Sequence, residues 1–306
     1  MYNLYFILCR IKKRRQEKKQ REIYVIQRFI EYLEAYYNLF LKERWIKSKG
    51  NYKLNKKRRN QKVIVSLTTF PGRINVVWLT IVSLMRQKIK PDLIILWLAR
   101  SQFETLEKLP KELLSLKGSG LEIRFCDDLK SHKKYFYTLK EYDNDIVILV
   151  DDDMFYPPDT IKKLLKMHKK YPTNICTMSG QVITPSFSTP PSKWRSPFLH
   201  EKYENSSKIQ IFSGSGSLYP PHCLHNDVFR KDLIEKLCPY ADDLWLTFMA
   251  LKNNTKITSY YPWRAFPISI YGTSEDCLWN INCQNGQNDE QWKNILEYFN
   301  ISNSNI

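Results

Sequence analysis

Three consecutive carboxylates follow a short apolar run near the middle of the 306-residue chain. Residues 146–150 read Ile-Val-Ile-Leu-Val, and Asp151, Asp152 and Asp153 come directly after them. An apolar run of this length predicts a buried strand, and α/β sheets bind ligands at the carboxyl ends of such strands. Adjacent carboxylates repel one another, and a divalent cation relieves that repulsion. The pattern predicts a metal site at a strand end; the alternative is an acidic strand end in a solvated turn.

Two further acids, Asp242 and Asp243, lie between Pro239 and the apolar residues 244–246. A carboxylate in such a place can act as a general base that takes the proton of an attacking hydroxyl group. Acidic side chains also stabilise the first turn of a helix. The residues by themselves leave both interpretations open.

Glycines and lysines offer weaker signals. Gly214 and Gly216 would let the backbone approach a ligand closely, or they simply form a turn. Lys133 and Lys134 would offset phosphate charge, or they are exposed loop lysines.

The elements that must position these residues alternate between strands and helices. We expect strands at residues 63–67, 93–98, 121–126 and 146–150, and helices at residues 76–87, 103–116, 134–141, 160–170, 232–236, 242–252 and 289–299. Such alternation indicates an α/β domain with a mainly parallel sheet flanked by helices. After residue 180 the prolines become frequent, which predicts irregular or antiparallel structure.

Positive charge is concentrated at the N-terminus. Residues 1–62 hold 19 Lys and Arg against 5 Asp and Glu, so they carry +14 of the net charge of +17. Apolar residues recur at helical spacing from Ile23 to Phe40, which predicts an amphipathic helix. The two interpretations are a helix lying on an anionic membrane surface and a helix packed on the protein's own core. We expect residues 1–62 to form a basic helical extension and residues 63–306 to form the main domain.

The seven cysteines are odd in number and include no C-x-x-C pair. They match neither a disulfide framework nor a zinc ribbon, so a reducing cytoplasm is the expected location. No apolar run approaches the roughly 20 residues that a spanning helix needs. Any membrane contact would therefore be peripheral, at the inner face.

Residues 150–157, Val-Asp-Asp-Asp-Met-Phe-Tyr-Pro, resemble the Asp-x-Asp segment of nucleotide-sugar glycosyltransferases of the GT-A fold, which is Rossmann-like. Four other segments resemble parts of that family in the same order. They are the first strand and nucleotide loop at 66–73, a basic stretch at 133–135, a glycine-rich acceptor-side segment at 214–221, and an acidic motif that opens a late helix at 241–245. The resemblance covers residues 63 to about 290, and residues 1–60 have no counterpart in it.

The resemblance implies a role for each matching position. Asp151 and Asp153 would hold Mn²⁺ or Mg²⁺ at the donor diphosphate, with Asp152 nearer the ribose or the sugar. Other donor-binding residues would be Thr68, Thr69, Arg73, Lys133 and Lys134. Gly214, Ser215, Gly216 and Trp245 would lie on the acceptor side. Asp243 would be the catalytic base, with Asp242 as the alternative.

The expected function is metal-dependent transfer of a sugar from a nucleotide sugar, foremost a UDP-sugar, to a glycan or lipid-linked acceptor in polysaccharide synthesis. One alternative is another metal-dependent α/β enzyme, such as a nucleotidyltransferase or a phosphatase. A second is a nucleic-acid-binding protein that uses the basic arm. Binding of nucleic acid is disfavoured, because the main domain carries only +3 and places three acids where a phosphate backbone would pass.

Overall fold

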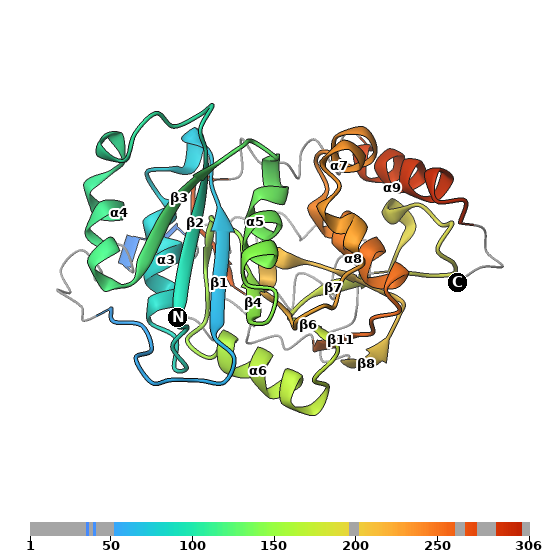
Figure 1. Ribbon diagram of the computed structural model, residues 1–306, viewed down its shortest axis with the longest axis horizontal. Coiled ribbons are helices and arrows are strands. Elements are labelled where there is room, and N and C mark those ends of the chain that lie inside the picture. Colours follow the sequence, from blue (N-terminus) through green and yellow to red (C-terminus); the bar gives the residue numbers. More distant parts are fainter. Residues whose placement is uncertain are drawn as a thin grey trace.

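A single eight-stranded sheet organises the molecule (Figure 1). The computed structural model describes residues 35–36, 39–40, 52–195, 202–260, 267–273 and 286–301. The strand order is β3-β2-β1-β4-β10-β6-β11-β8. Strands β3, β2, β1 and β4 run parallel, and β10 is antiparallel to both of its neighbours, β4 and β6. The mainly parallel α/β architecture expected from the sequence is confirmed.

The bounds of the strands in this sheet are β1 Val63–Thr68, β2 Leu93–Ala99, β3 Leu121–Cys126, β4 Ile146–Leu149, β6 Ile175–Thr177, β8 Lys202–Ser206, β10 Ser217–Tyr219 and β11 Ile257–Tyr260. Two small antiparallel pairs accompany it, β5 Met154–Phe155 with β12 Ile268–Ser269, and β7 Gly180–Val182 with β9 Ile209–Ile211. The antiparallel structure expected after residue 180 is thus present.

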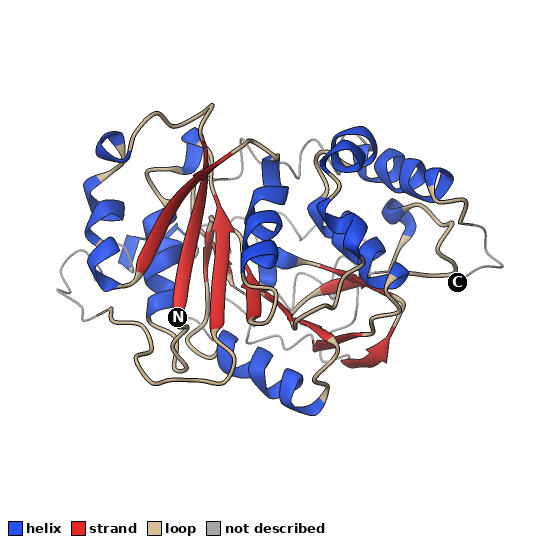
Figure 2. Ribbon diagram, viewed as in Figure 1, coloured by secondary structure: helices blue, strands red, loops and turns tan. Residues whose placement is uncertain are grey.

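Helices cover both faces of the sheet (Figure 2). Their bounds are α3 Val77–Met85, α4 Lys111–Ser115, α5 Lys133–Glu141, α6 Thr160–Lys170, α7 Lys231–Leu237, α8 Asp242–Lys252 and α9 Gln287–Tyr298. Side chains of α3, α4 and α6 form one core with one face of the sheet. Side chains of α5, α7, α8 and α9 form a second core on the other face.

Strand alternation explains why the central strands are apolar throughout. In β4, Ile146 and Ile148 enter the first core, whereas Val147 and Leu149 enter the second. A strand buried on both faces has no solvent side to mark with polar residues. The exception in β1 is Ser66, which is fully buried and donates from Oγ to the backbone O of Lys134 at 2.6 Å. Ser66 therefore fixes the first turn of α5 against the centre of the sheet.

One expected helix is much shorter in the structure. Residues 103–116 were predicted as one helix, but only Lys111–Ser115 is α-helical, after a 3₁₀ turn at Leu106–Lys108. Pro110 lies between the two pieces, has no backbone N–H and disfavours a helical conformation at Leu109. The prediction of one continuous helix over residues 103–116 was therefore wrong.

Residues 52–62 pack on the main domain. Leu54 lies against Gly120, where an added Cβ would come within 2.7 Å of Leu54 Cδ1. Arg59 Nη1 pairs with Asp92 Oδ2 at 2.7 Å, and Asn55 N donates to Pro91 O at 2.9 Å. The domain therefore begins by residue 52, whereas the sequence placed the boundary after residue 62. Most of the expected amphipathic helix lies outside the described residues.

Two further findings bear on the extension. Leu39 and Phe40 are 61% and 43% exposed, in helical conformation. Among the described residues, no helix is both long and apolar enough to cross a membrane.

We predict that a chain beginning at Tyr52 will melt near the temperature of the full chain and will lose its binding to anionic vesicles. Deleting residues 1–51 removes 13 Lys and Arg and 5 Asp and Glu. Each cation near an anionic membrane surface contributes about 1 kcal/mol to the free energy of binding. Sedimentation with phosphatidylserine vesicles measures the loss, with phosphatidylcholine vesicles as the control. A chain beginning at Val63 should melt lower, because it lacks Leu54 and Arg59. Equal vesicle binding by the Tyr52 chain and the full chain would contradict a membrane role for the extension.

Candidate active site

The three acids that follow β4 point to different partners. The side chain of Asp151 is 37% exposed and its Oδ1 lies 2.8 Å from Lys134 Nζ. Asp152 and Asp153 both pair with Arg73 instead, at 2.8 and 3.1 Å. The chain bends at Asp152 and Asp153, so the strict alternation of a strand, which would put Asp151 and Asp153 on one side, does not continue past β4.

Asp152 joins the loop after β1 to the end of β4. Its Oδ2 accepts from Thr69 Oγ1 at 2.5 Å and its Oδ1 accepts from Arg73 Nη1 at 2.8 Å. Burial raises the pKa of Asp152, and Arg73 and Thr69 oppose that rise. Both carboxylate oxygens are thus bonded to protein and the residue is only 5% exposed. Asp152 thus orients Arg73 and Thr69, while the expected contact of Asp152 with the donor stays a prediction.

A polar face of helix α3 holds the segment that follows the acids. Thr80 Oγ1 donates to Asp152 O at 2.7 Å and accepts from Met154 N at 3.1 Å. Ser83 Oγ accepts from Tyr156 N at 3.0 Å, and Gln87 Nε2 donates to Pro157 O at 2.7 Å. The sequence analysis missed these three residues. Their signal was the spacing of three and four residues between them, with Thr80 and Ser83 inside the otherwise apolar helix and Gln87 two residues past its end.

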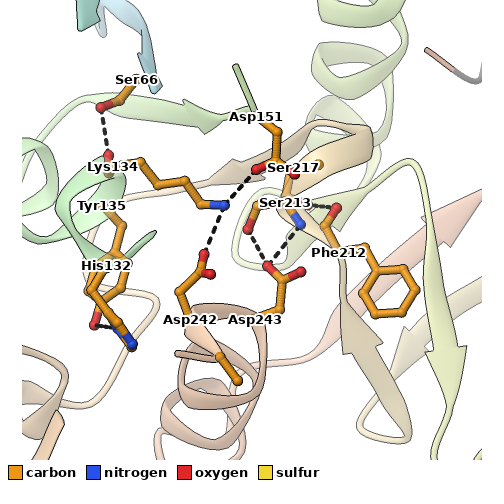
Figure 3. A network of polar contacts seen from close by, with 12 residues as sticks. Ser66, His132, Lys134, Tyr135, Asp151, Phe212, Ser213, Ser217, Asp242 and Asp243 are labelled. Atoms are coloured by element: carbon orange, nitrogen blue, oxygen red, sulfur yellow. Dashed lines mark hydrogen bonds and ion pairs between the residues drawn. The ribbon is translucent and has the colours of Figure 1, made fainter. Parts of the chain in front are cut away.

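Lys134 connects the two acidic motifs (Figure 3). Its side chain is 5% exposed, and Nζ lies 2.8 Å from Asp151 Oδ1 and 2.8 Å from Asp242 Oδ2. Burial disfavours the ammonium, but Asp151 and Asp242 outweigh it and raise the pKa of Lys134 well above its usual value. Asp242 is also buried, and attraction to Lys134 outweighs that burial and lowers the pKa of Asp242. Asp242 is therefore an ionised partner of Lys134.

Asp243 is held differently, by a serine rather than by an ammonium. Its Oδ1 accepts from Ser213 N at 3.0 Å and from Ser213 Oγ at 2.6 Å. Burial and the neighbouring Asp242 raise the pKa of Asp243 to about 7, while Lys134 opposes the rise. A half-buried carboxylate with this pKa can accept a proton near neutral pH. Ser213 was not singled out from the sequence, although it directly precedes the Gly-Ser-Gly segment.

Gly214, the residue after Ser213, lies against Asp151, one of the expected metal ligands. A Cβ at Gly214 would lie 2.3 Å from Asp151 Oδ2, closer than any side chain tolerates. The Tyr156 hydroxyl fixes the approach, because it donates to Gly214 O at 2.7 Å and accepts from Asp151 N at 2.9 Å. Asp151, Gly214 and Asp243 therefore lie close together in the fold, and their roles in one site stay a prediction.

A late segment completes the other side. Strand β12 pairs with β5, Ile270 N donates to Asp153 O at 2.7 Å, and Arg73 Nη2 donates to Thr273 O at 2.9 Å. No sequence pattern indicated that the segment around Ile270 lies beside Asp153, because the two residues are far apart in the chain.

Some expected site residues lie elsewhere. Trp245 is fully buried in the second core and its indole N–H donates to Val228 O at 3.3 Å, so its surroundings give no support to the expected acceptor-side position. Gly216 has φ +96° and faces Thr160 and Leu164 of α6. Ser215 is 8% exposed. Lys133 is paired with Asp128 and not with the cluster, and Thr68 Oγ1 donates to Trp97 O at 2.9 Å. Of the two lysines, only Lys134 reaches the acids.

The chemistry of the cluster fits a divalent cation. In the described part of the chain, five carboxylates surround two cations, Arg73 and Lys134. Burial and the neighbouring acids raise the pKa of Asp153 to about 7 despite Arg73. Carboxylate oxygens are the ligands that hard cations take. No three His, Cys, Asp or Glu side chains of the described ranges gather into a metal site by themselves, so other ligands would have to complete one.

Comparison with known protein families identifies the family of this chain. The sequence profile of glycosyl transferase family 2 matches residues 73–238, more than half of the chain. The chain therefore belongs to glycosyl transferase family 2, and it is a glycosyltransferase with the GT-A fold. The match contains Arg73, Lys134, the three acids and Gly214, and it ends just before Asp242. It decides against the nucleic-acid-binding, phosphatase and nucleotidyltransferase alternatives.

Solved structures show distant similarity. The crystal structure of TarS 1–349 from S. aureus is 16% identical, with a TM-score of 0.43 over 66% of this chain and 60% of that one. The mannosyltransferase PcManGT from Pyrobaculum calidifontis, in complex with GDP-Man and Mn²⁺, is 13% identical, with a TM-score of 0.48 over 89% of this chain and 73% of that one. The chain thus spans less than two thirds of the TarS fragment. No curated protein matches in sequence.

We predict that Gly214→Ala will lower kcat/KM by about 10²-fold while the protein stays folded. The added methyl group displaces the Asp151 carboxylate, and misplacing a reacting group by about 1 Å costs a factor of this size. Gly118→Ala is the matched control, since nothing lies within 4 Å of its Cβ position. Steady-state kinetics and thermal melting measure both variants. Equal activity of the two would show that the contact between Gly214 and Asp151 has no catalytic role.

Proposed function

We propose that this glycosyltransferase takes its sugar from a nucleotide-activated donor, with a divalent cation held by Asp151 and Asp153. The observation that carries the proposal is the excess of carboxylates over cations at the carboxyl end of β4. A divalent cation would offset part of this excess, and the diphosphate of a donor would supply further oxygen ligands to the cation. Mn²⁺ and Mg²⁺ are the cations that fit oxygen ligands of this kind, and a UDP-sugar is the donor we favour.

The bound cation would supply Lewis acid chemistry that stabilises the leaving nucleoside diphosphate. The chain's own residues do the remaining work. Arg73, held by Asp152 and by Thr273 O, places a fixed guanidinium beside Asp153. Thr69 and Asp152 fix the loop after β1, where the base and ribose of the donor would bind. Lys134 keeps Asp151 in place from the opposite side.

Asp243 is the proposed base for the acceptor hydroxyl. Ser213 orients Oδ1 of Asp243, and Gly214, the residue after Ser213, lies against Asp151. The acceptor would thus enter between the donor motif and the first turn of α8. Asp242 is unsuited to the same task, because Lys134 already holds its carboxylate and lowers its pKa.

The proposed acceptor is a glycan or a lipid-linked glycan, at the cytoplasmic face of a membrane. The charge of +14 on residues 1–62 and the exposure of Leu39 and Phe40 support a peripheral contact with anionic lipid. Deletion of residues 1–51, described above, tests the location without altering the site.

We predict that turnover will require Mn²⁺ or Mg²⁺ and will release a nucleoside diphosphate. Loss of the cation, or Asp151→Ala, should lower kcat by about 10³-fold, since Lewis acid stabilisation contributes several kcal/mol. A coupled assay of UDP or GDP release with a panel of sugar nucleotides measures this, with EDTA and re-added Mn²⁺. Calorimetry with UDP and GDP, with and without Mn²⁺, reports binding independently of turnover. Full activity in EDTA would exclude the proposed cation.

We predict that Asp243→Asn will lower kcat by about 10² to 10⁴, the usual cost of losing a general base. Nucleotide affinity should be unchanged, because Asp243 does not contact the donor motif. Asp242→Asn is the companion variant and should lose less than Asp243→Asn. In the wild type, kcat should fall as pH drops below about 7, because only the ionised carboxylate accepts a proton and the pKa of Asp243 is raised to about 7. If Asp242→Asn alone were inactive, the base would be Asp242.

A further inference from the structure

The site described above gives two adjacent carboxylates very different surroundings. Asp242 shares the Lys134 ammonium with Asp151, and its side chain is 10% exposed. Asp243, the next residue, receives two hydrogen bonds from Ser213 and is not paired with the ammonium. Figure 3 shows the two carboxylates side by side at the first turn of α8, with Lys134 reaching from α5 toward Asp242.

Lys134 is fixed at both ends. Its backbone O accepts from Ser66 Oγ at the centre of β1, and its Nζ contacts acids that belong to the end of β4 and to α8. The Lys134 ammonium therefore links the donor motif directly to the helix that carries the base. Without that cation, Asp151, Asp242 and Asp243 would be three neighbouring carboxylates that repel one another.

The neighbouring lysine provides a natural comparison. Lys133 is as deeply buried as Lys134, with a side chain 3% exposed, and it also pairs with a carboxylate, that of Asp128. Asp128 belongs to the loop after β3 and takes no part in the acidic cluster. Burial and ion pairing are therefore common to both lysines, whereas of the two only Lys134 pairs with Asp242.

From this juxtaposition we infer that Lys134 is a positioning residue: by neutralising Asp242 it keeps α8 against the donor motif and leaves Asp243 as the base. The inference rests on the proposed function, because it assigns Asp243 the acceptor proton. It differs from the phosphate-binding role that the resemblance implied, since Lys134 acts here through a protein carboxylate.

A charge-compensation cycle separates these two roles. The proteins are the full-length wild type, Lys134→Met, Asp242→Asn and the double variant Lys134→Met/Asp242→Asn, with Lys133→Met as the matched control. Each is measured for kcat, donor KM and melting temperature. Lys134→Met leaves Asp242 charged and buried without its partner, whereas the double variant removes both charges.

We expect Lys134→Met to lower kcat by about 10²-fold and to melt lower than the wild type. Adding Asp242→Asn should recover at least about tenfold in kcat and most of the melting temperature, because a buried pair with neither charge avoids the cost of one unpaired charge. Donor KM should stay near the wild-type value throughout. Lys133→Met should also melt lower, yet it should keep its kcat.

Three outcomes would overturn the inference: a double variant as inactive as Lys134→Met, a double variant that remains unfolded, or a raised donor KM that Asp242→Asn does not restore. The last of these would identify Lys134 as a phosphate ligand. The melting temperatures test the pairing of Lys134 with Asp242 even if no sugar nucleotide is turned over. Failure of the proposed function, seen as no nucleoside diphosphate release by the wild type, is therefore distinct from failure of this inference.

Discussion

The site depends on one electrostatic constraint: five carboxylates from two distant segments must lie close together inside the protein. Two buried cations make this arrangement possible. Arg73 neutralises Asp152 and Asp153, while Lys134 lies between Asp151 and Asp242. Each cation is itself fixed by the fold, Lys134 through the contact of its backbone with Ser66 and Arg73 through the backbone O of Thr273. Neither cation can move away. The negative charge that they leave unbalanced therefore stays near Asp151, whose side chain is 37% exposed.

The same constraint explains several features that look unrelated in the sequence. Gly214 must lack a side chain because the Asp151 carboxylate occupies the space. Tyr156 is buried because its hydroxyl joins that glycine to the backbone of Asp151. Thr80 and Ser83 of the buried helix α3, and Gln87 just after it, are polar because they bond to backbone groups of the chain that follows the acids. Each of these residues positions the segments that carry or adjoin the acids.

The parallel strands and most of the helices were predictable, whereas the individual short strands after residue 170 were not. Continuous apolar strands such as Leu93–Ala99 and Ile146–Leu149 are long enough to be read from their composition, and their alternation with helices indicates a parallel sheet. The three residues of β10 lie between glycines and prolines and carry no periodic signal, yet they pair with β4 and β6 in the centre of the sheet. Short strands of this kind are defined by the edges already present, which no local pattern encodes. Pro110 is the opposite case. It is a local signal for a break in the helix predicted at residues 103–116, and the prediction followed the apolar spacing instead.

The sequence by itself determined which residues carry the charge: a basic pair, three acids after an apolar strand that follows it, and two acids at a later helix start. It could not determine which acid faces which partner, because that depends on strand direction and on contacts between residues 79 to 200 positions apart, such as Arg73 with Asp152 and with Thr273. Only the tertiary structure decided that Asp152 faces inward, that Lys134 rather than Lys133 meets the acids, and that Trp245 belongs to the core. The physical reason is that residue type fixes the charge a side chain can carry, whereas burial and neighbouring charges fix where that charge is stable and what it can do.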